Sequence, residues 1–175
     1  MKKLLTFSFL LALAATTSFK GFSQAFKQGD KLLNAGIGLN SYYGNGLPIG
    51  ASFEVGITEA ISVGGQVDYN SGNYGGAGYS WGYTALYFGG RGSYHLNEVF
   101  KLNNDKLDTY AGIGLGFQSF KWSDASFGTG SAYGSGVYFN YFVGGRYMFA
   151  NNVGAFLELG STGFSNVRAG VTLKF

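Results

Sequence analysis

Eight segments of this chain alternate between apolar residues and small or polar residues, and this alternation restricts the fold more than any other feature. A period of two is typical of β-strands, in which successive side chains point to opposite faces. The segments are residues 31–40, 49–57, 61–69, 83–95, 109–119, 137–149, 153–161 and 168–175. The sequence therefore predicts an all-β fold with eight strands.

The two faces of these strands carry different chemistry. The apolar face has no Asp, Glu, Lys or Arg in its central part, whereas the opposite face combines many glycines with charged residues. Those charged residues are Glu54, Asp68, Arg91, Arg146, Glu158, Arg168 and Lys174. A soluble barrel needs the reverse arrangement, because water solvates charges but not apolar side chains. The pattern predicts an antiparallel up-and-down transmembrane β-barrel with a charge network inside it.

The inward face also predicts how the interior is filled. An eight-stranded barrel is only wide enough for side chains, so inward glycines such as Gly112 and Gly144 are expected to make room for the charged groups. Unpaired charges inside such a barrel are costly. We expect pairs between the acids Glu54, Asp68 and Glu158 and the arginines Arg91, Arg146 and Arg168. In 83–95 aromatic residues occur on both faces, and Arg91 is placed inward partly because of its charge.

The N-terminal residues are typical of a secretory signal peptide. Lys2 and Lys3 precede an apolar run over residues 4–15, and Ser23-Gln24-Ala25 forms a small-x-small cleavage site. We therefore expect a cleaved signal peptide over residues 1–25 and one barrel domain over 26–175. The mature part then carries nine basic and nine acidic residues, and this neutral balance argues against a nucleic-acid partner.

The last eight residues have the order polar, any, Gly, any, any, hydrophobic, any, aromatic. Arg168, Gly170, Leu173 and Phe175 occupy its four fixed positions. This order resembles the C-terminal assembly signal of outer-membrane barrels, which implies the barrel-assembly machinery as a partner. Over its whole mature length the chain resembles the small eight-stranded, porin-like outer-membrane barrels of the OmpA/OmpX type. The resemblance implies a Gram-negative outer membrane and its lipid, but it carries no reaction, cofactor or ligand.

The connections between the expected strands alternate in character. Four of them, rich in Gly, Ser, Asn and Tyr, are expected to be extracellular: 41–48, 70–82, 120–136 and 161–166. Two short ones, 58–60 and 150–152, are typical of periplasmic turns, and an even strand count places both termini in the periplasm. The connection 96–108 is a long periplasmic turn whose length the sequence does not explain. Aromatic residues near strand ends, among them Tyr43 and Tyr83, are interpreted as interface belts.

Few residues are candidates for chemistry. The glycines between Gly112 and Gly116 alternate within a strand, so they are not interpreted as a dinucleotide loop. His95 is the only histidine, and the sequence indicates no serine paired with it, so no catalytic residue is expected. Asn103, Asn104, Asp105 and Asp108 match no calcium-loop template and are interpreted as a solvated turn. We expect no metal and no cofactor.

One connection has the composition of a recognition surface. Residues 120–136 place four aromatic side chains among Ser and Gly: Phe120, Trp122, Phe127 and Tyr133. Such loops are common in adaptable binding surfaces. The alternative is an aromatic belt beside a mobile loop, and the sequence does not decide between the two or identify an extracellular ligand.

Three functions remain open from the sequence. The first is a non-enzymatic outer-membrane barrel with a structural role or a surface-interaction role through its loops. The second is a narrow, porin-like channel for small solutes, against which the density of inward charges argues. The third and most remote is a lipid-modifying barrel enzyme that uses His95 as its base.

Overall fold

The computed structural model describes residues 25–76, 79–123 and 134–175. The expected signal peptide, apart from Ala25, lies outside these residues. The elements of the described part are β1 (Lys31–Ser41), β2 (Ile49–Gly56), β3 (Ile61–Gly76), β4 (Tyr79–His95), β5 (Leu107–Trp122), β6 (Gly136–Met148), β7 (Val153–Ser161) and β8 (Ser165–Lys174). Within the described residues, no helix is long and apolar enough to cross a membrane.

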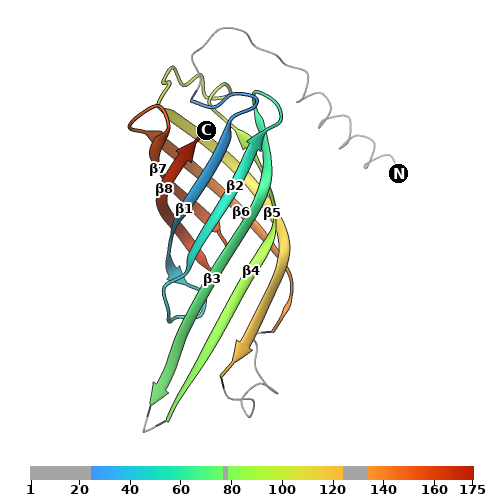
Figure 1. Cartoon of the computed structure of the whole chain (residues 1–175), viewed down its shortest axis with the longest axis vertical. Coiled ribbons are helices and arrows are strands. Elements are labelled where there is room, and N and C mark those ends of the chain that lie inside the picture. The colour runs from blue at the N-terminus through green and yellow to red at the C-terminus, as the bar shows by residue number, and fades with distance from the viewer. Residues whose placement is uncertain (1–24, 77–78, 124–133) are drawn as a thin grey trace, which may run out of the picture.

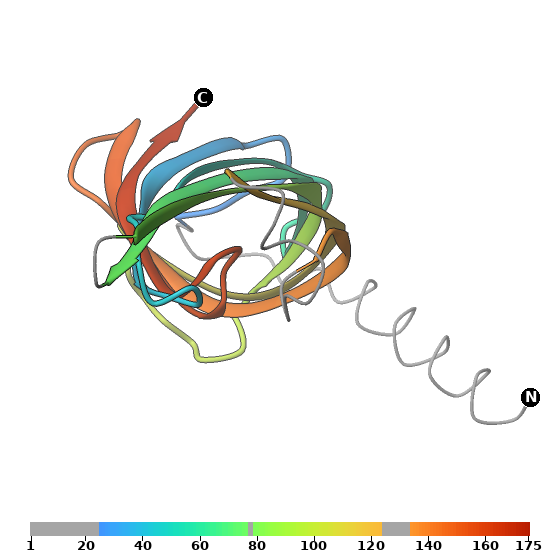
Figure 2. The ribbon, with the colours of Figure 1, turned by 90° about the horizontal axis from the view of Figure 1, so that it is seen from below.

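The eight strands form one closed barrel in chain order (Figures 1 and 2). Every neighbouring pair is antiparallel, and β1 closes the ring by pairing with β8, where Gly36 is opposite Gly170. This closure leaves no open sheet edge in the ring. The predicted fold, an eight-stranded antiparallel up-and-down barrel, is confirmed.

The barrel has two ends that differ in their connections. One end, which we call the terminal end, holds residues 25–30, Phe175 and the connections 57–60, 96–106 and 149–152. The other end, which we call the loop end, holds the remaining connections, from β1 to β2, β3 to β4, β5 to β6 and β7 to β8. In Figure 1 the terminal end is at the top, and β3 and β4 reach furthest toward the loop end.

The β3–β4 hairpin corrects one prediction. The expected loop 70–82 is mostly strand, because the register from Ile61–Tyr94 continues to Gly76–Tyr79. Alternation is lost in this extension, where polar residues and glycines predominate. Backbone hydrogen bonds need no apolar face, so the ladder continues beyond the part of the strand that the apolar pattern marks. For the same reason β5 is longer than the expected 109–119 at both of its ends.

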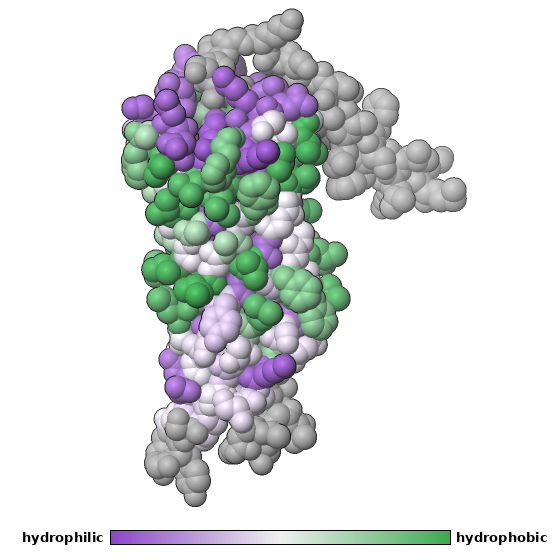
Figure 3. All heavy atoms as spheres, in the orientation of Figure 1, coloured by the Kyte–Doolittle hydropathy of each residue, from purple (hydrophilic) through white to green (hydrophobic). Residues whose placement is uncertain are grey.

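The two faces follow the predicted phase. In β4, Arg91 and His95 are each 4% exposed, whereas Phe88 is 53% exposed. The same contrast holds elsewhere, for example between buried Arg146 and exposed Tyr141 on β6. Figure 3 shows hydrophobic side chains around the middle of the molecule and a hydrophilic band at the terminal end. The barrel is therefore apolar outside, and the buried charged side chains of its strands point inside.

Inward glycines make room for large rings in the interior. A Cβ atom added at Gly112 would lie 2.3 Å from Cζ of Phe142, and one added at Gly144 would lie 2.8 Å from Cζ of Tyr110. Real Cβ atoms do not approach carbon atoms so closely. These glycines thus allow Phe142 and Tyr110 to lie flat against the wall beside the charged groups.

Candidate functional site

A network of ion pairs crosses the barrel interior. Nη2 of Arg146 on β6 lies 3.0 Å from Oε2 of Glu54 on β2. These strands are four positions apart in a ring of eight, so the pair joins opposite walls. Nη1 of Arg146 also lies 2.8 Å from Oδ2 of Asp108 on β5. All three side chains are at most 3% exposed, so the attraction between them is little screened by water.

Arg91 extends the same network to two further strands. Its Nη2 lies 2.7 Å from Oε1 of Glu158 on β7, and its Nε lies 3.3 Å from Oε2 of Glu54. Aromatic rings cover the guanidinium groups: Arg91 lies 4.0 Å from the ring centre of Phe142, and Arg146 lies 3.9 Å from that of Tyr110. Charge pairs and cation–π contacts together hold two buried arginines in place.

A second ion pair lies nearer the loop end. Nη1 of Arg168 is 3.2 Å from Oδ1 of Asp68, and Gln66 donates a hydrogen bond of 2.5 Å to Oδ2 of the same carboxylate. Lys174, in contrast, is not part of the buried network. Its ammonium group is at the terminal end, 2.6 Å from Oδ2 of Asp30, and the two side chains are 20% and 16% exposed.

His95 lies between a serine and an aspartate, which the sequence did not indicate. Its Nε2 is 3.1 Å from Oγ of Ser62, and its Nδ1 is 2.7 Å from Oδ1 of Asp108. Ser62 comes from β3, the strand that pairs with β4, and Asp108 comes from the start of β5. The sequence indicated no serine paired with His95, because the partner follows only from the strand register, which places Ser62 opposite Ser93.

Hydrogen bonding around Ser62 links this group to the ion-pair network. The Ser62 hydroxyl donates to Oε1 of Glu54 at 3.0 Å, and a serine has only one proton to donate. Its oxygen can still accept from Nε2 of His95, and Nδ1 of His95 lies against the Asp108 carboxylate. Among the described residues, the buried charged side chains are four acids and three arginines, and His95 is buried beside them.

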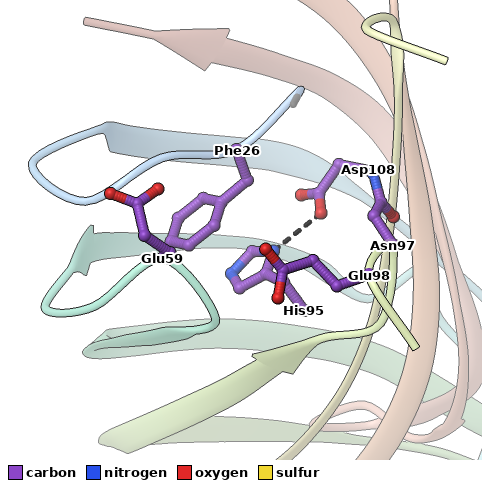
Figure 4. A pocket seen from close by; sticks show the side chains of 6 residues that line it. All are labelled: Phe26, Glu59, His95, Asn97, Glu98 and Asp108. Carbon is purple, nitrogen blue, oxygen red and sulfur yellow. Dashed lines mark hydrogen bonds and ion pairs between the residues drawn. The ribbon is translucent and has the colours of Figure 1, made fainter. Parts of the chain in front are cut away.

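A small pocket at the terminal end leads to His95 (Figure 4). Its lining consists of Phe26, Glu59, His95, Asn97, Glu98 and Asp108. The Phe26 ring is stacked on the imidazole with centroids 3.4 Å apart and planes inclined by 3°. Ser62 is completely buried and does not line this pocket. The N-terminal residues therefore cover the Ser62–His95–Asp108 group.

Asp108 is the site residue that the sequence analysis missed. It was interpreted as part of a solvated turn, yet it is 2% exposed and contacts both His95 and Arg146. The strand register indicates the role of Asp108, because this residue is directly opposite Arg146 on the neighbouring strand. Placing the start of β5 at residue 109 instead of 107 hid this pairing. No cluster of acidic, His or Cys side chains suited to a metal occurs among the residues that the structure describes.

Aromatic side chains fill the half of the interior near the loop end. The buried residues of this aromatic cluster are Tyr43, Tyr83, Tyr87, Phe120 and Phe164, and Ala85 packs among them. The rings of Tyr83 and Phe120 are stacked, with centroids 5.5 Å apart. Tyr43 and Tyr83 are 5% and 1% exposed, so the expectation that they belong to interface belts is wrong. The rings of Tyr43 and Tyr83 instead pack against each other in the interior, with centroids 5.2 Å apart.

The predicted recognition residues divide into two pairs. Phe120 and Trp122 contact the aromatic cluster, with their ring centroids 5.1 Å apart, and Phe120 is only 8% exposed. Phe127 and Tyr133 lie outside the described residues. Beside the cluster an open hollow of about 420 Å³ is lined by Tyr42, Tyr43, Gly44, Tyr74, Trp81 and Trp122. The loop end thus presents aromatic rings around a concave surface.

Three residues of the C-terminal pattern lie on the closing strand β8, and Phe175 follows directly after it. Arg168 points inward, Gly170 is opposite Gly36, and Leu173 is opposite Leu33 on β1. Phe175 is 69% exposed at the terminal end, and its backbone exchanges hydrogen bonds with Lys31. These positions belong to the seam between β1 and β8.

Solved structures with the same architecture are outer-membrane barrels. The outer membrane protein OprG from Pseudomonas aeruginosa matches with a TM-score of 0.57 at 11% identity, over 89% of this chain and 99% of that one. Ail, the attachment invasion locus protein of Yersinia pestis, matches with a TM-score of 0.50 at 12% identity, over 84% and 95% of the two chains. No protein-family model and no curated protein sequence matches the chain. The chain has the fold of small eight-stranded outer-membrane barrels.

Proposed function

We propose that this chain is an integral outer-membrane protein with a closed interior, which acts without enzymatic chemistry as a structural or surface-interaction component. Its termini lie in the periplasm and its loop end faces the outside of the cell. The exposed apolar side chains of the strands, for example Ile113 at 59% and Leu115 at 60%, support contact with lipid. In water such a belt would cause aggregation.

The observation that carries the proposal is the ion bridge between opposite walls. Arg146 reaches across from β6 to Glu54 on β2, and Arg91 joins Glu54 to Glu158. An eight-stranded barrel has no spare width beside such groups. Nearer the loop end, the buried aromatic cluster forms a second layer of side chains in the interior. A continuous path for solutes would require both layers to open.

Conductance in planar bilayers tests the closed interior. Purified, folded protein should give no stable single-channel currents, because hydrated ions cannot pass the Arg146–Glu54 bridge. Glu54→Gln, which weakens that bridge, should raise the frequency of brief openings, whereas Ser52→Ala on the same inward face should not. Stable and sizeable currents from the unmodified protein would contradict this proposal and support the narrow, porin-like channel instead.

The Ser62–His95–Asp108 group is the one feature that favours an enzyme. Its distances are similar to those of a nucleophile, a base and an orienting acid. Three observations support a structural role: Ser62 is fully buried, its proton goes to Glu54, and Phe26 covers His95. A serine hydroxyl that donates its proton to a carboxylate is not aligned to give that proton to His95.

Expression in a Gram-negative host decides between the enzymatic and the structural role of His95. We expect the mass of lipid A to be unchanged by the protein. A modified lipid A that disappears with both Ser62→Ala and His95→Ala, while both variants still fold, would establish an enzyme. Folding is checked by gel migration, since a closed barrel runs as a compact band that shifts only after boiling.

We assign the proposed surface-interaction role to the loop end. The hollow beside the aromatic cluster is concave and lined by tyrosine and tryptophan side chains, which are common in adaptable binding surfaces. Cells that display the Trp81→Ala variant should adhere more weakly to the surface that the protein recognises, and the variant should fold normally. An exposed Asn103→Ala variant at the terminal end is the matched control and should leave adhesion unchanged.

A further inference from the structure

The connection between β4 and β5, residues 96–106, is larger than the barrel needs. The other two connections at the terminal end, 57–60 and 149–152, join neighbouring strands with four residues each. Residues 96–106, which we call the β4–β5 turn, contain additional turns closed by hydrogen bonds from the Phe100 amide to the Leu96 carbonyl and from Leu102 to Asn97. Hydrogen bonds thus hold the additional residues of this turn in a folded conformation.

Asn97 fixes this turn to the barrel. It is 7% exposed, and its side-chain oxygen accepts hydrogen bonds from the amide and the hydroxyl of Thr109 at 2.7 and 2.8 Å. Its side-chain amide donates to the carbonyl of Leu107. A buried side chain with three such bonds holds the base of the turn in one orientation. The tip of the turn is therefore presented in a defined direction.

The tip carries two adjacent apolar side chains that have no cover. Val99 is 58% exposed and Phe100 is 59% exposed. Glu98 lines the pocket beside His95 (Figure 4), so it is directed toward the barrel mouth. The charged residues exposed on this turn are Lys101, Asp105 and Lys106, with a net positive charge. Apolar residues beside lysines are the combination that binds at the surface of a phospholipid bilayer.

The turn points away from the mouth of the barrel. In Figure 2 the yellow-green segment between β4 and β5 projects outside the ring of strands. Tyr147 and Phe149, on β6 and just after it, are also exposed toward the terminal end, at 46% and 65%, and Tyr147 is opposite Leu107 at the start of β5. The apolar tip is thus directed over the lipid-facing side.

We propose that the β4–β5 turn is a lipid-binding anchor on the periplasmic leaflet. Val99 and Phe100 enter the boundary between headgroups and acyl chains, and Lys101 and Lys106 contact lipid phosphates. The occupant of this surface is phospholipid, because the turn lies beside the bilayer. This inference depends on the proposed membrane location, and it gives the length of the turn a function.

Site-directed labelling tests the anchor, because the chain contains no cysteine. Single cysteines at Phe100, Asn103 and Leu115 are labelled with an environment-sensitive fluorophore, and the proteins are folded into vesicles of phosphatidylethanolamine and phosphatidylglycerol. Lipids with a nitroxide near the headgroup or deep in the chain then quench each label. We expect shallow quenching at Phe100→Cys about threefold stronger than at Asn103→Cys, and deep quenching at Leu115→Cys.

The outcomes separate this inference from the proposed function. Quenching of Leu115→Cys together with a Phe100→Cys label as accessible to water as Asn103→Cys would overturn the anchor alone. Loss of quenching at Leu115→Cys as well would overturn both. Self-quenching at Phe100→Cys that rises with protein density would assign the tip to contacts between copies and would also overturn the lipid anchor. Val99→Cys repeats the test at the adjacent position.

Discussion

The interior of this barrel has two halves that are closed by different interactions, ion pairs in one half and packed aromatic rings in the other. Toward the terminal end, charges pair across the lumen around Glu54, Arg91 and Arg146, each at most 4% exposed. Toward the loop end, rings such as Tyr83 and Phe164 pack against one another. Ion pairs depend on every partner, because one removed partner leaves a buried charge. Packed rings depend on total volume and tolerate substitution more gradually.

This difference predicts which half of the barrel is sensitive to substitution and which half tolerates it. A single isosteric substitution in the ionic half should cause a large loss in the free energy of unfolding. Each substitution in the aromatic half should cause only a small loss. The loop end, which is also the proposed interaction surface, is then the half in which sequence change costs least. The following substitutions test this contrast.

The largest effect is expected for Glu54→Gln. It keeps the size of the side chain but removes the carboxylate that Arg91 and Arg146 share. Removing one partner of a buried ion pair costs about 3–5 kcal/mol. Urea-induced unfolding in lipid vesicles, followed by tryptophan fluorescence, measures this free energy.

The control for Glu54→Gln is Ser52→Ala, on the same strand and the same face. Ser52 is 3% exposed, and its hydroxyl has no hydrogen-bond partner among the described residues. Its removal should change the free energy of unfolding by less than about 1 kcal/mol. Equal losses for the two variants would show that the ionic half is not specially sensitive.

A smaller effect is expected for Phe164→Leu in the aromatic half. Phe164 is 1% exposed, and its ring centroid lies 5.7 Å from that of Tyr43. A shorter apolar side chain leaves a partial cavity and should cost about 1–2 kcal/mol. The same unfolding experiment applies. A loss as large as that of Glu54→Gln would remove the contrast between the halves.

The smallest effect is expected for Tyr83→Phe. The Tyr83 hydroxyl accepts from the Asn70 amide at 3.1 Å and donates to the Asn45 carbonyl. The Asn70 amide also donates to Ser41 at 2.8 Å, so it keeps one partner. The expected loss is about 1 kcal/mol. A loss of several kcal/mol would mean that hydroxyl bonds, and not ring packing, hold this half together.

The strands were predictable because each one has to present an apolar face to lipid. Alternation placed all eight strands, but the inward phase of Arg91 and His95 was chosen partly because of the charge of Arg91. The extension of β3 and β4 was not predictable in this way, since residues such as Asn70 and Gly72 carry no alternation. Backbone pairing, which the sequence does not display, decides where such strands end.

The interior was predictable in its chemistry but not in its partners. Inward charges followed from the period of two, whereas the pairing of Asp108 with Arg146 and of His95 with Ser62 depends on register. The aromatic cluster was missed for another reason. Tyrosine is suited to the lumen, to the interface and to loops alike, so composition did not decide the position of Tyr43 or Tyr83.

The most direct test of the whole account compares one arginine placed in lipid with one placed in water. Leu115, 60% exposed at the middle of β5, and Gly134, exposed with no atom near its Cβ position, are the two sites. Unfolding from vesicles should show Leu115→Arg destabilised by about 2–4 kcal/mol, with Gly134→Arg unchanged. Equal stability of the two variants would contradict the assignment of the apolar face to lipid.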